Sequence, residues 1–243
     1  MTSKKQQRLH EKIRDAIERQ FADLAYFSPI PGERELCQQL GVSRPTVRKA
    51  LELLEAENKI VRMQGRGSFY TGEKIPVDYS EVETRGFGLA QMFSAEGRVT
   101  RSTVLQQVVE PAHGNLAAML GVAAETLVFH LKRLRYVDEH IYAVTDDYIP
   151  LALCPELMHV DFTSSGLLRT LEAHGVHPYA EDKTIEVIHA APEIALYLEV
   201  EEQAPIFVTR ILTTDRTGRV IQYATAKADA FRSRFRIRST AKE

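Results

Sequence analysis

The stretch Pro31 to Leu54, P-G-E-R-E-L-C-Q-Q-L-G-V-S-R-P-T-V-R-K-A-L-E-L-L, decides the fold of the N-terminal part of the chain. Its apolar spacing predicts two short helices joined by a tight turn. The first helix is expected to start after Gly32 and to stop at Gly41, because glycine tolerates the left-handed C-cap conformation. Ser43 is expected to cap the second helix through its hydroxyl, and Pro45 is tolerated in a first turn.

The second expected helix has a buried stripe and a basic exposed half. The residues expected to be buried recur at helical spacing: Val47, Ala50, Leu51 and Leu54. The residues expected outside are Arg44, Thr46, Arg48 and Lys49. In a helix-turn-helix this half of the second helix enters the DNA major groove. Taken alone, the stretch is also compatible with a solvated helical hairpin that has a basic face.

A second element follows directly. Ile60 to Tyr70 predicts two short strands around a Gly65-Arg66-Gly67 tip, which is the pattern of a wing. A wing lies against the DNA backbone or the adjacent minor groove. The residues expected there are Gln64, Gly65 and Arg66. An amphipathic helix over residues 7–21 is expected to support this unit through Leu9, Ile13, Ala16, Ile17 and Phe21.

From Pro31 to Tyr70 the chain resembles the DNA-binding domain of the GntR family of bacterial transcription regulators. The family pattern is P-S-E-R-E-L-A, then V-S-R-x-T-V-R-x-A-L, then a G-x-G wing. Gly32, Cys37 and Asn58 depart from it, away from the expected base-reading surface. The resemblance implies that six residues correspond to family positions that meet DNA: Arg34, Ser43, Arg44, Thr46, Arg48 and Gly65.

The charge of the chain changes sign along its length. Residues 1–72 carry 13 Lys and Arg against 9 Asp and Glu, and the remainder carries 18 against 24. A basic head on an acidic body fits a DNA-binding unit followed by a unit that does not bind DNA. With 243 residues the chain is long enough for two domains that each bury a core.

Cysteine usage and apolar runs argue against other classes. Cys37 and Cys154 lie far apart with no C-x-x-C partner, so neither a zinc site nor a disulfide framework is indicated, and we expect no cofactor. No apolar run approaches the length of a membrane span, and the Lys-rich start lacks a signal-peptide core. We therefore expect a cytoplasmic protein.

The winged unit is expected to span residues 1–72, followed by a linker at 73–83 and a second domain at 84–243. Mixed alternation and 3.6-residue spacing predict an α+β domain, an antiparallel sheet partly covered by helices. The expected strands are Thr126–Tyr136, Ile141–Tyr148, Lys183–Ile188, Ile206–Thr214 and Val220–Asp229. The expected helices are Gly114–Leu120, Ser165–His174 and Pro192–Leu198.

The second domain resembles the effector-binding UTRA domain of the HutC branch of the GntR family, whose fold is similar to chorismate lyase. The markers are the R-x-R-Y of Arg133 to Tyr136, a strand ending in Tyr148-Ile149-Pro150, the A-x-x-L of Ala195 to Leu198, and Gly218. Together the two resemblances cover most of residues 8–238. In UTRA domains the matching positions bind the phosphate of a small metabolite.

Arg133 and Arg135 project from one face of an expected strand, the face that also carries Leu127, Phe129 and Leu131. A buried guanidinium is costly, by about 3–5 kcal/mol when its partner is removed. Either internal carboxylates pair with the two arginines or a bound anion does. We favour the anion, because guanidinium forks suit phosphate and phosphonate oxygens.

Two donor-rich segments are expected to complete the anion site. Ser164-Ser165 stands at the start of an expected helix, where free amides and the helix dipole favour an anion. The loop Thr84 to Gly88 contains Arg85, Gly86 and Phe87, and its glycines let backbone amides approach a ligand closely. Because this loop leaves the linker, its ordering by a ligand is expected to reset the angle of the DNA-binding heads.

The rest of the effector site favours an amine slightly over a sugar. Thr145 and Gln222 replace acidic residues of relatives that bind amino-sugar phosphates, and Ala228-Asp229 replaces their final Y-R. An aminoalkylphosphonate is therefore slightly favoured over a phosphosugar. The carboxylates that can receive its amine are Asp146, Asp147 and Glu186. Strand parity puts Thr145 and Asp146 on opposite faces, and the sequence leaves open which one faces inward.

We predict a ligand-responsive transcription regulator and no enzyme activity. It is expected to bind a palindromic operator as a homodimer, since two half-sites on one DNA face require two heads. The alternative is a small-molecule-binding protein or lyase-like enzyme whose basic head docks a protein partner, without salt-dependent DNA affinity. Ser164-Ser165-Gly166 lacks the G-x-S-x-G elbow, and His174 and His177 straddle a helix end, which favours surface histidines.

Overall fold

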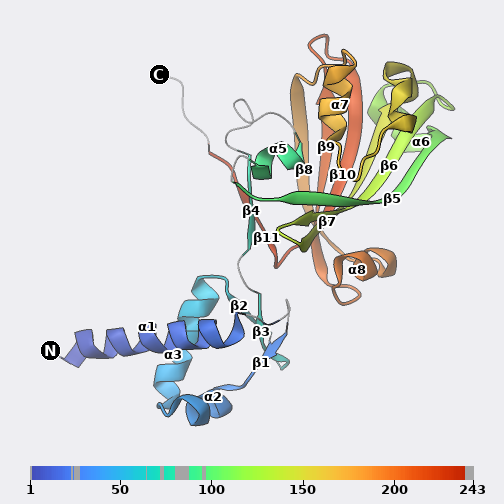
Figure 1. The fold of residues 1–243 in the computed structure, drawn as a ribbon. Helices are drawn as coiled ribbons and strands as arrows, with labels where there is room; N and C mark the ends of the chain where they lie inside the picture. The colour runs from blue at the N-terminus through green and yellow to red at the C-terminus, as the bar shows by residue number, and fades with distance from the viewer. Residues whose placement is uncertain are drawn as a thin grey trace. The chain divides into compact units, whose positions relative to one another are not determined.

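The chain folds into two compact units. The structure is a computed structural model, and it describes residues 2–22, 24, 28–63, 65–71, 74–79, 88–94 and 97–238. The chain divides into the units Met1–Lys74 and Ile75–Glu243. Figure 1 labels the helices and strands of both.

The first unit packs three helices against a small sheet. The helices are α1 (Thr2–Phe21), α2 (Glu33–Leu40) and α3 (Arg44–Ala56). The strands β1 (Pro29–Ile30), β2 (Ile60–Met63) and β3 (Gly67–Tyr70) form a sheet in the order β1-β3-β2. Gly41 ends α2 with a φ of 64°, as predicted for a left-handed cap. The predicted helix-turn-helix and wing are therefore confirmed.

The core of this unit contains the stripe that we predicted on α3. Val47, Ala50, Leu51 and Leu54 are buried against residues of α1 and α2. Leu9 is a correction, because its side chain is 41% exposed. The buried face of α1 begins one turn later, at Ile13.

A six-stranded antiparallel sheet organises the second unit (Figure 1). Its strand order is β5-β6-β7-β10-β9-β8. The strands are β5 (Thr100–Pro111), β6 (Leu127–Val137), β7 (His140–Pro150), β8 (Ala180–His189), β9 (Pro205–Thr214) and β10 (Val220–Asp229). The sequence predicted all of these except β5. The mostly polar start of β5 gives little strand signal, and its place at the sheet edge permits such residues.

Short helices connect these strands. They are α5 (Leu89–Ser94), α6 (Gly114–Leu120), η1 (Leu151–Leu153), η2 (Pro155–His159), α7 (Leu167–Ala173) and α8 (Pro192–Leu198). The bounds of α6 and α8 are those predicted, whereas α7 begins two residues later than expected. Among the described helices none has both the length and the apolar character needed to span a membrane.

The segment predicted as a linker, residues 73–83, contains a strand. Here β4 (Ile75–Asp78) pairs in parallel with β11 (Ser233–Arg236). Ile75 and Val77 are buried in one cluster with Phe93 of α5. We predicted a linker because Pro76 argues against a helix, but a proline is compatible with a strand of this small sheet. The linker prediction is therefore wrong for residues 75–78.

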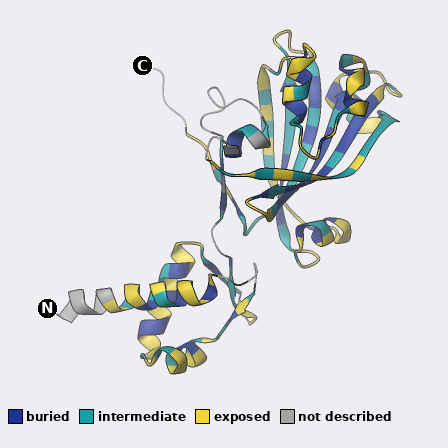
Figure 2. Cartoon of the chain, in the orientation of Figure 1, coloured by how far each residue is buried: buried dark blue, intermediate teal, exposed yellow. Residues whose placement is uncertain are grey.

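Different helices cover the two faces of the six-stranded sheet. On one face α7 and the η1–η2 segment pack over Phe129, Leu131 and Ile149. We call this the inner face. On the outer face α8 packs over Leu134 and Val144, and α6 packs over Val128. The central strands are consequently buried along most of their length (Figure 2).

Candidate functional site

The first candidate site is the exposed half of α3. Arg44, Arg48 and Lys49 are exposed there, and Arg34 is exposed on α2. The Arg48 guanidinium contacts Glu33 at two points, with Nε donating to Oε1 at 3.3 Å and Nη2 to Oε2 at 3.1 Å. This contact lowers the pKa of the Glu33 carboxyl. Glu33 thus holds the Arg48 guanidinium in place, while the side chain of Arg48 stays 60% exposed.

Two details of this surface correct the predictions. Ser43 occupies the N-cap position, but its hydroxyl lies 2.8 Å from Thr46 Oγ1 and makes no capping bond to an amide. Thr46 is only 7% exposed, so the prediction that it lies outside is wrong for this conformation. Its hydroxyl is directed at Ser43, which draws the side chain back to the helix start.

The wing presents its tip as the sequence predicted. Gly65 and Gly67 adopt φ values of 75° and 104°, which non-glycine residues rarely reach. Arg66 is exposed between them. Gln64 lies outside the described residues. Exposed guanidiniums on α2, α3 and the wing give this unit the groups that contact phosphates and base edges.

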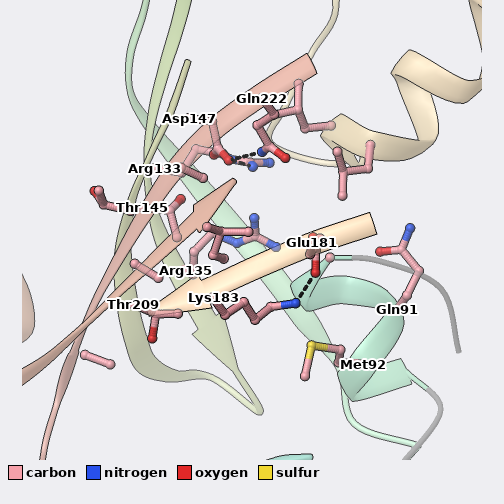
Figure 3. Close-up of a pocket in the computed structure, with 18 of the residues that line it drawn as sticks. Gln91, Met92, Arg133, Arg135, Thr145, Asp147, Glu181, Lys183, Thr209 and Gln222 are labelled. Atoms are coloured by element: carbon pink, nitrogen blue, oxygen red, sulfur yellow. Dashed lines mark hydrogen bonds and ion pairs between the residues drawn. The ribbon is translucent and has the colours of Figure 1, made fainter. Parts of the chain in front are cut away.

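The second candidate site is a cavity of about 100 Å³ on the inner face of the sheet. Its floor includes three alanines of β10, Ala224, Ala226 and Ala228, whose small side chains leave the space open. Tyr79 and Phe235, from the ends of the β4–β11 pair, line it together with Gly88 and residues of α5 and α7. Its charged and amide side chains include Gln91, Arg133, Arg135, Asp147, Glu181, Lys183 and Gln222 (Figure 3).

Arg133 is paired inside the protein. Its Nη2 donates to Asp147 Oδ2 at 3.1 Å, across the neighbouring strands β6 and β7. Gln222 Nε2 donates to the other Asp147 oxygen at 2.7 Å, and Gln222 Oε1 accepts from Thr213 Oγ1 at 3.0 Å. Both oxygens of Asp147 are therefore occupied by protein donors.

Arg135 differs from Arg133 in its surroundings. Its side chain lines the same cavity, and the residue is 7% exposed. No carboxylate among the described residues lies within ion-pair distance of its guanidinium, and its buried Nε has no hydrogen-bond partner among them. Burial, followed by repulsion from Arg133, lowers the pKa of Arg135 to about 9. The group is still charged at neutral pH, so the described lining of the cavity contains a cation that no described carboxylate pairs with.

Two further polar atoms at this end of the cavity lack partners. Arg133 Nε and Thr145 Oγ1 are buried and have no hydrogen-bond partner in the described part of the chain, and the two residues are direct cross-strand partners. Buried polar groups are normally satisfied, because leaving one unpaired costs about 1–3 kcal/mol. Together with Arg135 they form a convergent set of donors that an oxyanion can satisfy.

The structure separates the residues predicted for effector binding. Arg133, Arg135, Thr145 and Gln222 line the cavity. Ser165 is not among its lining residues, because α7 begins only at Leu167 and the Ser165 amide donates to the Asp161 carbonyl. Arg85, Gly86 and Phe87 lie outside the described residues.

Asp146 is the other correction, because it lies on the outer face. It is 3.1 Å from His130 Nε2 and 3.0 Å from Lys227 Nζ. Burial opposes its ionisation, but the bonds from His130 and Lys227 keep the pKa of Asp146 below its ordinary value. Glu186 also leaves the site, since it pairs with Arg210. The inward residues of β7 are Thr145 and Asp147.

Sequence reasoning missed two charged residues of the cavity, Glu181 and Lys183. They alternate on β8 and so point to one face, as Arg133 and Arg135 do on β6. The expected strand began at Lys183, three residues after the true start of β8, which removed Glu181 from consideration. The same two-residue charge spacing that singled out the arginines was present here as well.

Two family models match the chain. The bacterial regulatory proteins of the gntR family match residues 5–69, and the UTRA domain matches residues 95–232. The first match covers the winged unit with α3. The second covers the whole six-stranded sheet and most of the cavity.

Named relatives agree with these matches. The chain is 30% identical over 195 residues to the HTH-type transcriptional regulator GgaR of Escherichia coli K12, covering 80% of this chain and 75% of that protein. It is 28% identical over 193 residues to the probable fructoselysine utilization operon transcriptional repressor of Escherichia coli K12, covering 79% and 77%. The crystal structure of PhnF from Mycobacterium smegmatis shares the fold, with a TM-score of 0.66 at 22% identity over 95% of this chain and 100% of PhnF.

The two arginines of the cavity are expected to respond oppositely to the same substitution. Arg135→Leu removes an uncompensated buried charge, so we expect the free energy of unfolding of the ligand-free protein to rise by about 1–4 kcal/mol. Arg133→Leu, the matched control, strands Asp147 and is expected to lower it by about 3–5 kcal/mol. Urea unfolding in an anion-free buffer measures both. A loss of stability in Arg135→Leu as large as that in Arg133→Leu would show that Arg135 is compensated.

Proposed function

The chain belongs to the GntR family of bacterial transcription regulators and carries a UTRA domain, and on this premise we propose that a small tetrahedral oxyanion in the cavity controls its binding to DNA. The helix-turn-helix, the wing and the named relatives make it a DNA-binding regulator. The relatives are named as transcriptional regulators, so the chain is not an enzyme. The alternative of a lyase-like enzyme is therefore wrong.

One observation carries the effector proposal: Arg135 is buried in the cavity without a partner carboxylate among the residues that the structure describes. A phosphate or phosphonate group supplies the missing negative charge and accepts the donors of Arg133, Arg135 and Thr145. Side-chain packing around the rest of the cavity supports a small ligand. Ala224, Ala226 and Ala228 line a cavity of about 100 Å³, a volume that favours a short aminoalkylphosphonate over a phosphosugar.

The relatives differ from one another in what their names describe. One is named for a fructoselysine utilization operon, and the name of the other states no ligand. The effector of this chain is therefore argued from its own cavity. The regulated genes, in this proposal, serve uptake or breakdown of a phosphonate or phosphorylated metabolite.

Operator binding follows from the two-unit design. In this proposal two copies place their α3 helices in successive major grooves of a palindromic operator in the cytoplasm. β4 follows directly after the last residue of the DNA-binding unit, and Tyr79 at its end lines the cavity. A ligand that contacts Tyr79 can thereby alter the segment that joins the two units.

The effector class is tested by a ligand panel. Phosphosugars, aminoalkylphosphonates and inorganic phosphate are added separately, and the thermal midpoint is recorded, because a ligand of the folded state raises it. We expect a rise with a phosphonate or phosphate compound that also changes operator affinity, and no rise in Arg135→Leu. Absence of any rise across the panel in the wild type would reject the oxyanion.

DNA reading is tested at Arg48. We expect Arg48→Ala to weaken binding to an operator selected from random DNA by about 1–3 kcal/mol, while binding to unselected DNA changes much less. Fluorescence anisotropy at two salt concentrations measures both. Lys59→Ala, outside the α3 surface, is the control expected to keep the operator preference. An equal loss on selected and unselected DNA would mean that Arg48 contacts only phosphates.

Anion affinity is expected to depend on pH through Arg135. Its pKa of about 9 in the free protein rises when an anion binds, so binding requires the protonated guanidinium. With ethyl phosphate, whose own charge is constant above about pH 8, affinity should be about halved at pH 9. It should then fall by up to about tenfold per pH unit. Calorimetric titration of the wild type and Lys183→Met should show the same fall. A level affinity at pH 10.5 would contradict the role of Arg135.

A further inference from the structure

The cavity contains a second ion pair, and it lies on a different strand from the arginines. Glu181 and Lys183 are two residues apart on β8 and pair with each other. Their side chains are 6% and 17% exposed. Lys183 Nζ also lies 4.9 Å from the ring centroid of Tyr79. Figure 3 shows the pair and the Arg135 guanidinium among the residues that line one cavity.

The described lining of the cavity contains two carboxylates, Asp147 and Glu181. Asp147 is the less available of the two, because each of its oxygens already accepts a bond from a protein donor, Arg133 or Gln222. Among the described residues Glu181 is bonded only to Lys183, through one oxygen. Lysine is a flexible partner, and the face of Tyr79 offers its ammonium a second position. Glu181 is therefore the carboxylate that can receive a cation from a ligand.

The strand register puts the two groups on different strands of one cavity. Arg135 lies on β6, opposite Ala143 of β7, and Glu181 lies on β8, opposite Thr213 of β9. β7, β10 and β9 run between these two strands, and Ala224, Ala226 and Ala228 of β10 line the cavity there. Because both side chains line the one cavity, a ligand with an anion at one end and a cation at the other can meet both.

The charges of the lining point the same way. Arg133, Arg135 and Lys183 face Asp147 and Glu181, which leaves one excess positive charge among the described lining residues. A phosphate monoester brings about −1.5 to −2 at neutral pH and overcompensates it. In a phosphonate that also carries an ammonium group, the ammonium offsets one of the negative charges. The net charge of such a ligand comes closer to balancing the one excess positive charge of the lining.

We infer that Glu181 is the receptor for an ammonium group, and that the effector is a zwitterion with its tetrahedral anion at Arg135 and its amine at Glu181. This inference rests on the proposed function. It assigns recognition of the amine end of the effector to β8. Two of the carboxylates expected from the sequence, Asp146 and Glu186, instead make their contacts outside the cavity.

The test compares three phosphonates that differ in one group. Methylphosphonate, 2-aminoethylphosphonate and phosphonoacetate are titrated calorimetrically into wild type, Glu181→Gln and Glu186→Gln. Glu186 lies on the same strand but pairs with Arg210 outside the cavity, so its variant is the matched control. We expect the wild type to prefer the amine over the methyl compound at least tenfold. Glu181→Gln should lose that preference and keep its methylphosphonate affinity within about twofold, and Glu186→Gln should retain both.

Lys183→Met provides a second readout if Glu181→Gln folds poorly. It removes the internal competitor of the ligand amine, so the preference for 2-aminoethylphosphonate should increase. Two results would overturn the ammonium receptor and leave the proposed function standing. One is binding of all three phosphonates without a preference for the amine. The other is a preference for phosphonoacetate that Lys183→Met abolishes. No binding of any phosphonate or of inorganic phosphate would overturn both.

Discussion

The ion pair between Arg133 and Asp147 leaves Arg135 without a partner carboxylate among the described residues, and the effector site that we propose depends on that charge. Asp147 is held from both sides, by Arg133 and by Gln222, so it cannot turn to the second guanidinium. Burying an unpaired charge is among the most costly things a fold can do. Such a site makes sense when an external anion completes it, since the same interaction then supplies ligand affinity.

The sheet makes this arrangement possible. On the adjacent strands β6 and β7, Arg133 lies opposite Thr145 and pairs with Asp147, whereas Arg135 lies opposite Ala143. The small alanine side chains of β10 leave space above the sheet. Tyr79, which lines the cavity, directly follows β4, the strand that begins where the DNA-binding unit ends in the chain. A ligand in the cavity, as we propose, therefore contacts a residue next to the segment that joins the two units.

The first unit could be predicted almost residue by residue, because its signals are local. Gly41 ends a helix, Pro45 lies in the first turn of the next, and the spacing of Leu51 and Leu54 fixes the buried face. Thr46 was misplaced because a hydroxyl-to-hydroxyl contact with its neighbour is not encoded in periodicity. The cavity was less predictable. The arginines stand out by type and spacing, but the choice between the two residues at 145 and 146, and the place of Glu181, depend on strand register and true strand starts, which pattern alone does not give.

The central claim is that Arg135 is the anchor of a bound oxyanion, and an anomalous diffraction measurement tests it most directly. A crystal of the protein soaked in selenate, a tetrahedral oxyanion that scatters anomalously, should show a difference peak in the cavity within hydrogen-bond distance of the Arg135 guanidinium and Thr145 Oγ1. A cavity without a peak, with Arg135 turned onto a carboxylate, would contradict the account.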